Sequence, residues 1–392
     1  MFRPQIQQTW ILVSLAVFSI LMVYFALANI TYEKTKGFQD KIRAVEIMED
    51  ALSILKKEVR KGKDDPLLKD IDPNLSGLIF NIPNSPMTTY SGDLESKQTV
   101  LKPNFAALFV DLFFHAELSN GDTIAVGMTG SMPGANIALL SACEAMRIVP
   151  IIITSVGASE WGATDSNFTW LDLESVLFNN DIISYKSVAA SLGGRGDMYE
   201  EYEVEEYTYG GVWGQRLASE AIERNKVKRI VFSKGERLED RKKIYKNNID
   251  NGSLRSYSAY VNIGGGVGSI GLRGFKRFGI KIINPKEVMA NSTYKKTFNN
   301  GIVSEFANNN VKLINIQDIP NLIKDDSGKQ LIGFGGEKGV TGEGLLFYSE
   351  RYTLWTTMLA LLLTLGIVIA IGINSFRQIN EHTHSYETES TL

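Results

Sequence analysis

The chain has 392 residues with 41 basic and 44 acidic side chains, so its net charge is −3 and we predict no general affinity for nucleic acid. A single cysteine, Cys143, rules out an intrachain disulfide framework and is predicted to pack as a small core residue within a helix. Of the three histidines, only His115 lies away from the C-terminal end, which argues against a Ser-His-Asp triad and a zinc site of His and Cys ligands. We expect no metal and no cofactor.

A charge-free apolar segment lies near each end of the chain. Ile11–Ala28 has 18 residues and Leu354–Ile373 has 20, about the length that crosses a bilayer core as a helix. Aromatic residues stand near the ends of both segments, as is typical of membrane interfaces. The predicted organisation is an N-terminal tail (1–10), a transmembrane helix (11–30), an amphipathic helix with an irregular approach segment (31–103), an α/β domain (104–347), a second transmembrane helix (354–373) and a polar tail (374–392).

Two opposing signals bear on the orientation of these segments. Ala26-Leu27-Ala28 resembles a small-residue cleavage site, so the first segment is either a retained helix or a secretory signal, and both would export the domain that comes after it. Lys34, Lys36, Lys41 and Arg43 lie close behind the segment, and the positive-inside rule would keep them in the cytoplasm. Because long domains translocate largely regardless of charge, we predict a two-pass protein of the cytoplasmic (inner) membrane with its large domain outside the cytoplasm.

The segment after the first apolar stretch begins as a helix and then becomes irregular. Phe38–Lys63 carries apolar residues at helical spacing, whereas Asp64–Pro103 is rich in Pro, Asn, Ser, Thr and Gly. We therefore predict a long irregular approach, and after it an apolar helix over Asn104–Leu118 that leads into the α/β domain.

The stretch Gly121–Asp172 predicts a β-loop-α-β unit with a polar loop after it. Thr123–Val126 and Ile148–Ile153 are apolar, as strands covered on both faces must be, and Ala135–Met146 between them carries helix formers. The loops after the two strands are expected at the carboxyl edge of a parallel sheet, where open α/β sheets bind their ligands.

Two interpretations of the glycine-rich loop Gly127–Gly134 stay open. Its glycines do not fit a dinucleotide fingerprint, and no Gly-Lys-Ser/Thr marks a phosphate loop, so they could serve only tight turns and close helix packing. Alternatively, they let the backbone approach an anion at the helix start. The next loop, Thr154–Asp165, favours a binding role because hydroxyls, a carboxylate and an indole come directly after a buried strand.

The rest of the domain repeats such units. We predict helices around Trp170–Asn179, Gly211–Asn225 and Gly301–Asn308, and strands near Ile182–Val188, Arg229–Phe232, Ala259–Ile263 and Val311–Ile316. Gly264-Gly265-Gly266 forms a second junction between a strand and a glycine loop. Short buried strands that alternate with helices indicate an α/β fold with a doubly wound, mostly parallel sheet of Rossmann-like units, flanked by N- and C-terminal transmembrane helices.

The candidate site combines the polar residues of these loops. The predicted ligand-binding residues are Thr129, Gly130, Ser131, Ser155, Ser159, Glu160, Trp161, Asp165, Gly264, Gly265 and Gly266. If the site is catalytic, Ser131, Ser155 or Ser159 is the candidate nucleophile, and a lysine would have to replace the missing histidine base. Asp165, Asp172 and Glu174 are the carboxylates that would suit Mg²⁺ or Ca²⁺, but helix capping explains Asp172 and Glu174 more simply.

Charge is segregated along the domain. Asp197–Glu206 holds six carboxylates and no base, Lys226–Lys246 holds nine bases against three acids, and Arg273–Lys286 holds five bases and no acid. Such runs are usually solvated faces, and the alternative is a patch that faces a polyanion.

Several stretches together resemble a known family. They are Asp72-Pro-Asn-Leu-Ser-Gly77, Ser85-Pro-Met-Thr-Thr89, Gly92-Asp-Leu-Glu-Ser-Lys97, Gly127-Met-Thr-Gly-Ser-Met-Pro-Gly134, Ser155-Val-Gly-Ala-Ser-Glu-Trp-Gly-Ala-Thr-Asp165, Phe168-Thr-Trp-Leu-Asp172, Ser187-Val-Ala-Ala-Ser-Leu-Gly-Gly194 and Val261-Asn-Ile-Gly-Gly-Gly266. They look like the membrane-anchored protein of bacterial poly-γ-glutamate capsule synthesis and export systems, over about Phe38–Phe347. The resemblance implies a place beside an ATP-dependent γ-glutamyl ligase and its small membrane partner, but it carries no catalytic residue set.

The sequence supports two functions from different classes. The first is a membrane-anchored, non-catalytic component that binds or guides the anionic γ-glutamyl polymer. Its expected partners are γ-linked polyglutamate, the membrane-bound synthase components and membrane lipid. The second is an enzyme that processes the polymer, a serine-dependent hydrolase or a transpeptidase-like protein. The loop glycines, the basic runs and the near absence of histidine favour the first.

Overall fold

A computed structural model of the chain describes residues 4–59, 70–73, 76–80, 82, 85–204, 207–230, 237–271, 282–286, 301–333 and 342–389. The chain divides into two compact units. One combines Met1–Lys34 with Tyr348–Leu392, and the other is Thr35–Phe347.

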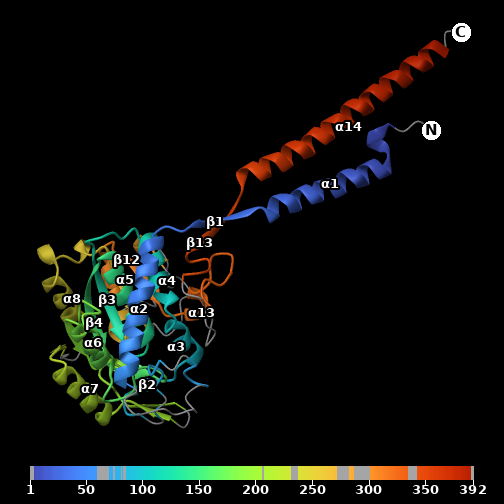
Figure 1. The fold of residues 1–392 in the computed structure, drawn as a ribbon. Helices are drawn as coiled ribbons and strands as arrows, with labels where there is room; N and C mark the ends of the chain where they lie inside the picture. Colours follow the sequence, from blue (N-terminus) through green and yellow to red (C-terminus); the bar gives the residue numbers. More distant parts are fainter. Residues whose placement is uncertain are drawn as a thin grey trace. The chain divides into compact units, whose positions relative to one another are not determined.

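The first unit is a pair of helices joined to a short ladder. The helices α1 (Thr9–Ala28) and α14 (Leu354–Glu389) are both long and apolar enough to cross a membrane, which agrees with the prediction (Figure 1). They continue into β1 (Ile30–Lys34) and β13 (Tyr348–Tyr352), which pair antiparallel with Ile30 opposite Tyr352 and Lys34 opposite Tyr348. The residues that follow α1 and precede α14 are therefore held side by side.

Helix α14 is longer than the predicted second span. It continues through residues 374–389, where the sequence predicts only a polar tail. Two polar side chains of this extension form hydrogen bonds with the N-terminal residues of the same unit, which helps to hold it as a helix. Ser375 Oγ accepts the N–H of Ile6 at 2.9 Å, and Gln378 Oε1 accepts the N–H of Gln5 at 3.1 Å.

The second unit is built on a seven-stranded sheet. In spatial order its strands are β11 (Ile282–Ile283), β12 (Lys312–Ile316), β10 (Ala259–Ile263), β3 (Thr123–Thr129), β4 (Val149–Ser155), β6 (Ala189–Ser191) and β9 (Lys228–Arg229). All neighbours pair parallel except β11 with β12. The predicted α/β class with a mostly parallel sheet is confirmed.

The order of the strands brings two segments that are distant in sequence to the centre of the sheet. The chain passes from β3 outward through β4, β6 and β9, and then returns to the other side of β3 with β10 and β12. The register pairs Thr129 with Ser155 and Gly127 with Asn262. The carboxyl ends of β3, β4, β6 and β10 therefore lie along one edge.

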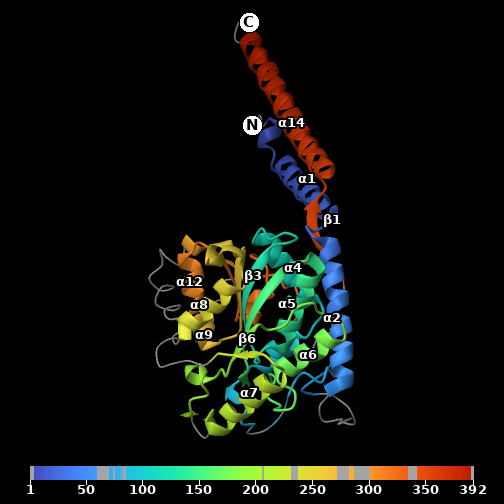
Figure 2. The ribbon, with the colours of Figure 1, turned by 90° about the vertical axis from the view of Figure 1, so that its left-hand side faces the viewer.

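Helices lie on either side of this sheet (Figure 2). The helices α2 (Phe38–Val59), α4 (Asn104–His115), α5 (Pro133–Met146) and α6 (Trp170–Asn179) form one group, and α8 (Arg237–Asn247), α9 (Val267–Ile270) and α12 (Ile302–Asn308) form the other. On the second side Tyr245, Tyr257, Tyr260 and Phe306 pack as an aromatic cluster, with the rings of Tyr260 and Phe306 stacked at 4.6 Å. On the first side Cys143 is buried in α5, as predicted.

Two parts of the predicted secondary structure differ from the structure. The strand expected near Ile182–Val188 lies further along the chain, as β6 (Ala189–Ser191). Residues 182–188 are outside the sheet, where Ser184 bonds Glu144 and Ser187 bonds Glu174. The segment expected to be irregular contains β2 (Thr88–Tyr90) and α3 (Leu94–Val100), whose buried residues are largely polar. Of the strand expected at 229–232, β9 ends at Arg229, and residues 231–232 lie outside the described part.

Close packing explains Gly134, the second residue of α5. A Cβ atom there would lie 2.6 Å from the backbone oxygen of Val100 and 2.9 Å from the amide nitrogen of Leu101. The glycine therefore lets α3 and the turn after it approach the start of α5. At Gly134 this supports the interpretation that the glycines of the loop serve close packing. The contact also positions α3, which carries Lys97 of the candidate site described below.

We expect Gly134→Ala to destabilise the protein by about 2 kcal/mol, because the added methyl meets backbone that cannot rotate away. The free energy of unfolding measured by chemical denaturation tests this. Gly265→Ala is the matched control, since the nearest atom to its Cβ would be Gln317 Nε2 at 3.9 Å. Equal stability of the two variants would contradict the packing explanation.

Candidate functional site

The loops after β3 and β4 are bonded to each other. The N–H of Gly130 donates to the carbonyl of Ser155 at 3.0 Å, and the N–H of Ala163 donates to the carbonyl of Gly130 at 2.9 Å. As a result, two predicted hydroxyl residues meet: the N–H of Ser159 donates to Ser131 Oγ at 3.0 Å. Ser159 belongs to the short strand β5 (Ala158–Ser159), which pairs with β2.

A lysine that the sequence pattern did not single out completes this group. Lys97 on α3 places its Nζ 2.7 Å from Ser159 Oγ, and the same Nζ bonds the backbone oxygen of Ser131. Lys97 is only 2 % exposed, whereas Ser131 and Ser159 are half-buried. The amine is thus buried against the Ser159 hydroxyl and the Ser131 carbonyl oxygen, both of which belong to half-buried residues.

Burial changes the chemistry of this amine. It lowers the pKa of Lys97 from 10.5 to about 7, against the opposing attraction of Asp93 and Glu160, which favours the charged form. A substantial fraction of the amine is therefore neutral at physiological pH and can accept a proton. A neutral lysine at hydrogen-bond distance from a serine hydroxyl is an arrangement that activates the serine as a nucleophile.

Glu160 is held beside this pair by two donors. Its Oε2 accepts the N–H of Gly92 at 3.1 Å, and its Oε1 accepts the hydroxyl of Tyr209 at 3.2 Å. A Cβ on Gly92 would lie 2.1 Å from the Glu160 carbonyl oxygen, so this contact requires a glycine. Glu160 therefore adds negative charge near Lys97 from a fixed position.

A second polar cluster lies at the ends of β4 and β6. Arg241 Nη2 donates to Asp197 Oδ2 and to Ser191 Oγ, both at 2.7 Å, and Ser191 also donates to Asp197 Oδ1 at 2.7 Å. Ser155 Oγ lies 3.1 Å from Ser191 Oγ. All four side chains are buried, so the charges of Arg241 and Asp197 compensate each other in the interior. Ser155 is committed to this cluster rather than to Lys97.

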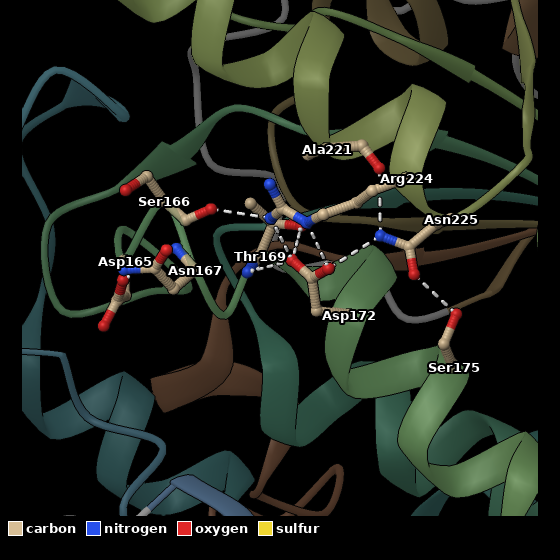
Figure 3. Close-up of polar contacts among 9 residues, drawn as sticks. All are labelled: Asp165, Ser166, Asn167, Thr169, Asp172, Ser175, Ala221, Arg224 and Asn225. Atoms are coloured by element: carbon tan, nitrogen blue, oxygen red, sulfur yellow. Dashed lines mark hydrogen bonds and ion pairs between the residues drawn. The ribbon is translucent and has the colours of Figure 1, made fainter.

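Some of the remaining predicted site residues lie next to these clusters, and others make separate contacts. Thr129 and Gly264–Gly266 lie at the ends of β3 and β10, next to Ser155. Trp161 forms an isolated bridge with Phe80 and has a left-handed φ of 64°. Asp165 is half-buried and accepts the N–H of Asn167 at 2.8 Å (Figure 3).

Asp172 acts as a structural acceptor, as the capping explanation predicts. Its carboxylate accepts the N–H of Thr169 at 2.8 Å at the start of α6, and it also bonds Arg224 and Asn225 at the end of α7 (Val212–Arg224) (Figure 3). Among the described residues, no three His, Cys, Asp or Glu side chains gather to hold a metal ion.

Capping is the wrong explanation for Glu174. Its side chain is buried and accepts the N–H of Ser187 at 3.0 Å and the hydroxyl of Ser187 at 2.8 Å. Burial is the main cause that raises the pKa of Glu174 from 4.5 to about 7. The bonds from Ser187 limit this rise because they favour the carboxylate.

The basic run Lys226–Lys246 is partly internal. Arg241 is buried against Asp197, and Lys242 pairs with Glu305 at 3.0 Å. Most of the run Arg273–Lys286 lies outside the described residues. Arg241 and Lys242 therefore form ion pairs within the fold rather than a patch that faces a polyanion.

Sequence reasoning missed three charged residues of the two clusters. Asp197 and Arg241 lie within runs that were interpreted only by net charge, and Lys97 lies in the segment expected to be irregular. One signal for Lys97 was present, because it ends the stretch Gly92-Asp-Leu-Glu-Ser-Lys97 that carries the family resemblance.

Comparisons of the chain with protein-family models, with curated proteins and with solved structures each return no match. The resemblance to the poly-γ-glutamate system protein therefore stays a prediction.

We expect stability to fall as pH rises through the range set by Glu174. Its folded pKa of about 7 lies above the ordinary value of 4.5, so its contribution is fully present below pH 4.5 and is lost by about pH 7. The loss is on the order of 3 kcal/mol. Glu174→Gln, which keeps an acceptor for Ser187 without a charge, should remove this part of the pH dependence.

Urea denaturation of the two proteins at pH 5 and pH 8 measures the difference. Glu46→Gln, at an exposed carboxylate of α2, serves as the carboxylate control, and it should retain the wild-type slope. An unchanged slope in Glu174→Gln would show that the buried carboxyl is ionised across this range.

Proposed function

We propose that this protein is a membrane-anchored serine–lysine enzyme that cleaves or transfers amide-linked acyl groups of γ-linked polyglutamate. The observation that carries the proposal is the buried Lys97 amine 2.7 Å from Ser159 Oγ. A non-catalytic polymer guide does not require an amine of lowered pKa aimed at a half-exposed hydroxyl. This geometry therefore favours the enzyme over the binding component that the sequence favours.

The chemistry depends on the positions of the two side chains. Neutral Lys97 accepts the proton of Ser159 as Oγ attacks the carbonyl carbon of the amide, and the carbonyl electrons move to its oxygen. When the tetrahedral intermediate collapses, the C–N bond breaks and the Lys97 ammonium gives its proton to the leaving amine. The acyl group stays on Ser159 as an ester until water attacks in hydrolysis, or a second amine attacks in transfer, with Lys97 again accepting the proton.

Ser131 has a supporting role in this proposal. Its backbone oxygen bonds Lys97 Nζ, and its Oγ accepts the N–H of Ser159. One residue therefore fixes both members of the pair. The backbone of Gly162 packs closely against the loop that carries Ser131. A Cβ atom added to Gly162 would lie 2.8 Å from the backbone oxygen of Ser131, so the contact requires a glycine.

The substrate class rests on the sequence resemblance, which also supplies the proposed partners, namely the membrane-bound synthase components of a capsule system and membrane lipid. The order of the strands and the helices on both sides of the sheet support a doubly wound, Rossmann-like classification. In such sheets the carboxyl edge is the ordinary ligand position, and Ser131 and Ser159, which Lys97 contacts, follow β3 and β4 at that edge.

We predict that Ser159→Ala abolishes shortening of γ-linked polyglutamate and that Lys97→Met lowers kcat by about 10²–10⁴-fold, the usual effect of losing a general base. The wild-type rate should rise with pH to a plateau above about 7, because neutral Lys97 is the active form. Polymer length on a gel and release of new amino groups measure both. The control is Ser219→Ala, which should keep the wild-type rate because the Ser219 hydroxyl bonds the backbone oxygen of Gln215 within α7.

Polymer binding separates the two proposed classes of function. If wild-type protein binds the polymer, leaves its length unchanged at every pH and tolerates Lys97→Met, the enzyme proposal is wrong and the binding component stands. Because Lys97→Met replaces the aliphatic part of the side chain and removes the amine, circular dichroism should report an unchanged fold.

We also propose the topology that the sequence predicts, with unit Thr35–Phe347 outside the cytoplasm and both termini inside. The two apolar helices and the ladder that joins their ends support it. Protease added to spheroplasts should remove the central unit and leave both termini protected. Cleavage of the termini with a protected centre would reverse the assignment.

A further inference from the structure

One buried hydroxyl at the carboxyl edge of the sheet lacks a partner. Thr129, the last residue of β3, is 3 % exposed, and within the described part of the chain its Oγ1 makes no hydrogen bond. Burying a hydroxyl unsatisfied is unfavourable. The fold thus retains a donor that nothing in the described chain uses, two residues before Ser131.

This hydroxyl points at the loop Gly264–Gly266 that comes after β10. A Cβ on Gly264 would lie 2.5 Å from Thr129 Oγ1, and a Cβ on Gly266 would lie 3.0 Å from Thr129 Cγ2. Gly264 also has a left-handed φ of +84°. Packing against Thr129 and backbone conformation therefore explain the first and third glycines of the loop.

Gly265 has no such explanation. It is exposed, its φ lies outside the left-handed region, and the nearest atom to an added Cβ would be Gln317 Nε2 at 3.9 Å. A side chain would fit there without strain in the protein itself. A glycine at such a position leaves the loop backbone open to an approaching molecule.

The side chains beside the loop Gly264–Gly266 suit a ligand that accepts hydrogen bonds, and together they carry no net charge. A Cβ on Gly266 would lie 3.6 Å from Ser155 Oγ, and one on Gly268 would lie 2.3 Å from Arg241 Nε. Arg241 is paired with Asp197, so the neighbouring cluster brings no net charge to the edge. A ligand that accepts hydrogen bonds would satisfy Thr129.

We infer that Thr129 and the loop Gly264–Gly266 form a subsite that binds a carboxylate of the substrate beside the bond attacked by Ser159. The inference rests on the proposed function. A γ-linked glutamate chain carries one α-carboxylate for each amide, so any bond placed at Ser159 has a carboxylate close to it. Charge-assisted bonds from hydroxyl and backbone donors are the ordinary means of holding such a group.

The test measures binding of γ-linked glutamate oligomers to full-length protein in nanodiscs, in the Ser159→Ala background so that no cleavage occurs. We expect Thr129→Val and Gly265→Val each to raise the Kd by roughly tenfold, as for loss of a hydrogen bond to a charged group. Thr129→Val should also raise the melting temperature, because it removes an unsatisfied buried hydroxyl. Gly366→Val on α14, where no described protein atom would lie within 4 Å of an added Cβ, is the matched control and should leave the Kd unchanged.

A second probe is the same oligomer with its α-carboxylates converted to amides. It should bind more weakly to the parent, and neither subsite variant should weaken it further. Unchanged Kd values for the acidic oligomer in both variants would overturn the subsite, and equal loss for both oligomers would overturn its preference for carboxylate. Cleavage by protein that retains Ser159 is scored separately, so a bound but uncut oligomer would refute the enzyme and keep the subsite.

Discussion

The arrangement of this site depends on the burial of one amine. Lys97 lies at the junction of α3 with the loops after β3 and β4, where it bonds the oxygen of Ser131 and the hydroxyl of Ser159. Removing an ammonium from water is costly, and the nearby carboxylates of Asp93 and Glu160 offset only part of that cost. The protein therefore holds a base of nearly neutral pKa at a position that three separate chain segments define. Gly134, Gly162 and Gly92 permit the backbone contacts that keep those segments together.

The two polar clusters differ in how they manage charge. Arg241 and Asp197 are both buried and compensate each other directly, with Ser191 bonded to both, which gives a locked structural pair. Lys97 instead meets mainly neutral acceptors, and its carboxylate neighbours act through space. The first arrangement joins a buried base directly to a buried acid, whereas the second lowers the pKa of the amine and permits it to lose its proton. This contrast is the physical reason to place chemistry at Ser159 rather than at Ser155.

Much of the fold could be predicted from local pattern. The β3-α5-β4 unit, β10, β12 and the two apolar helices are all indicated by continuous apolar runs with helix formers or glycines between them. Helix α3 could not be predicted, because its buried residues other than Val100 are polar (Ser96, Lys97, Gln98 and Thr99) and resemble a loop in composition. Their burial arises from tertiary contacts with segments far away in sequence. Ser131 and Ser159 could be proposed as site residues because they come after apolar strands. The position of Lys97 could not, because it depends on the tertiary packing of a segment without a hydrophobic pattern.

The way in which the large unit begins and ends has a consequence for its independence. The N–H of Thr35 donates to the carbonyl of Phe347 at 2.9 Å, so the first and last residues of this unit are hydrogen-bonded neighbours. A unit whose ends already meet can be joined end to end and opened elsewhere at little entropic cost. Its two ends therefore lie together, with one apolar helix before them in the chain and one after. A circular permutant with Phe347 linked to Thr35 and new ends opened in another loop is geometrically accessible, and the same unit is suited to transfer between another pair of helices.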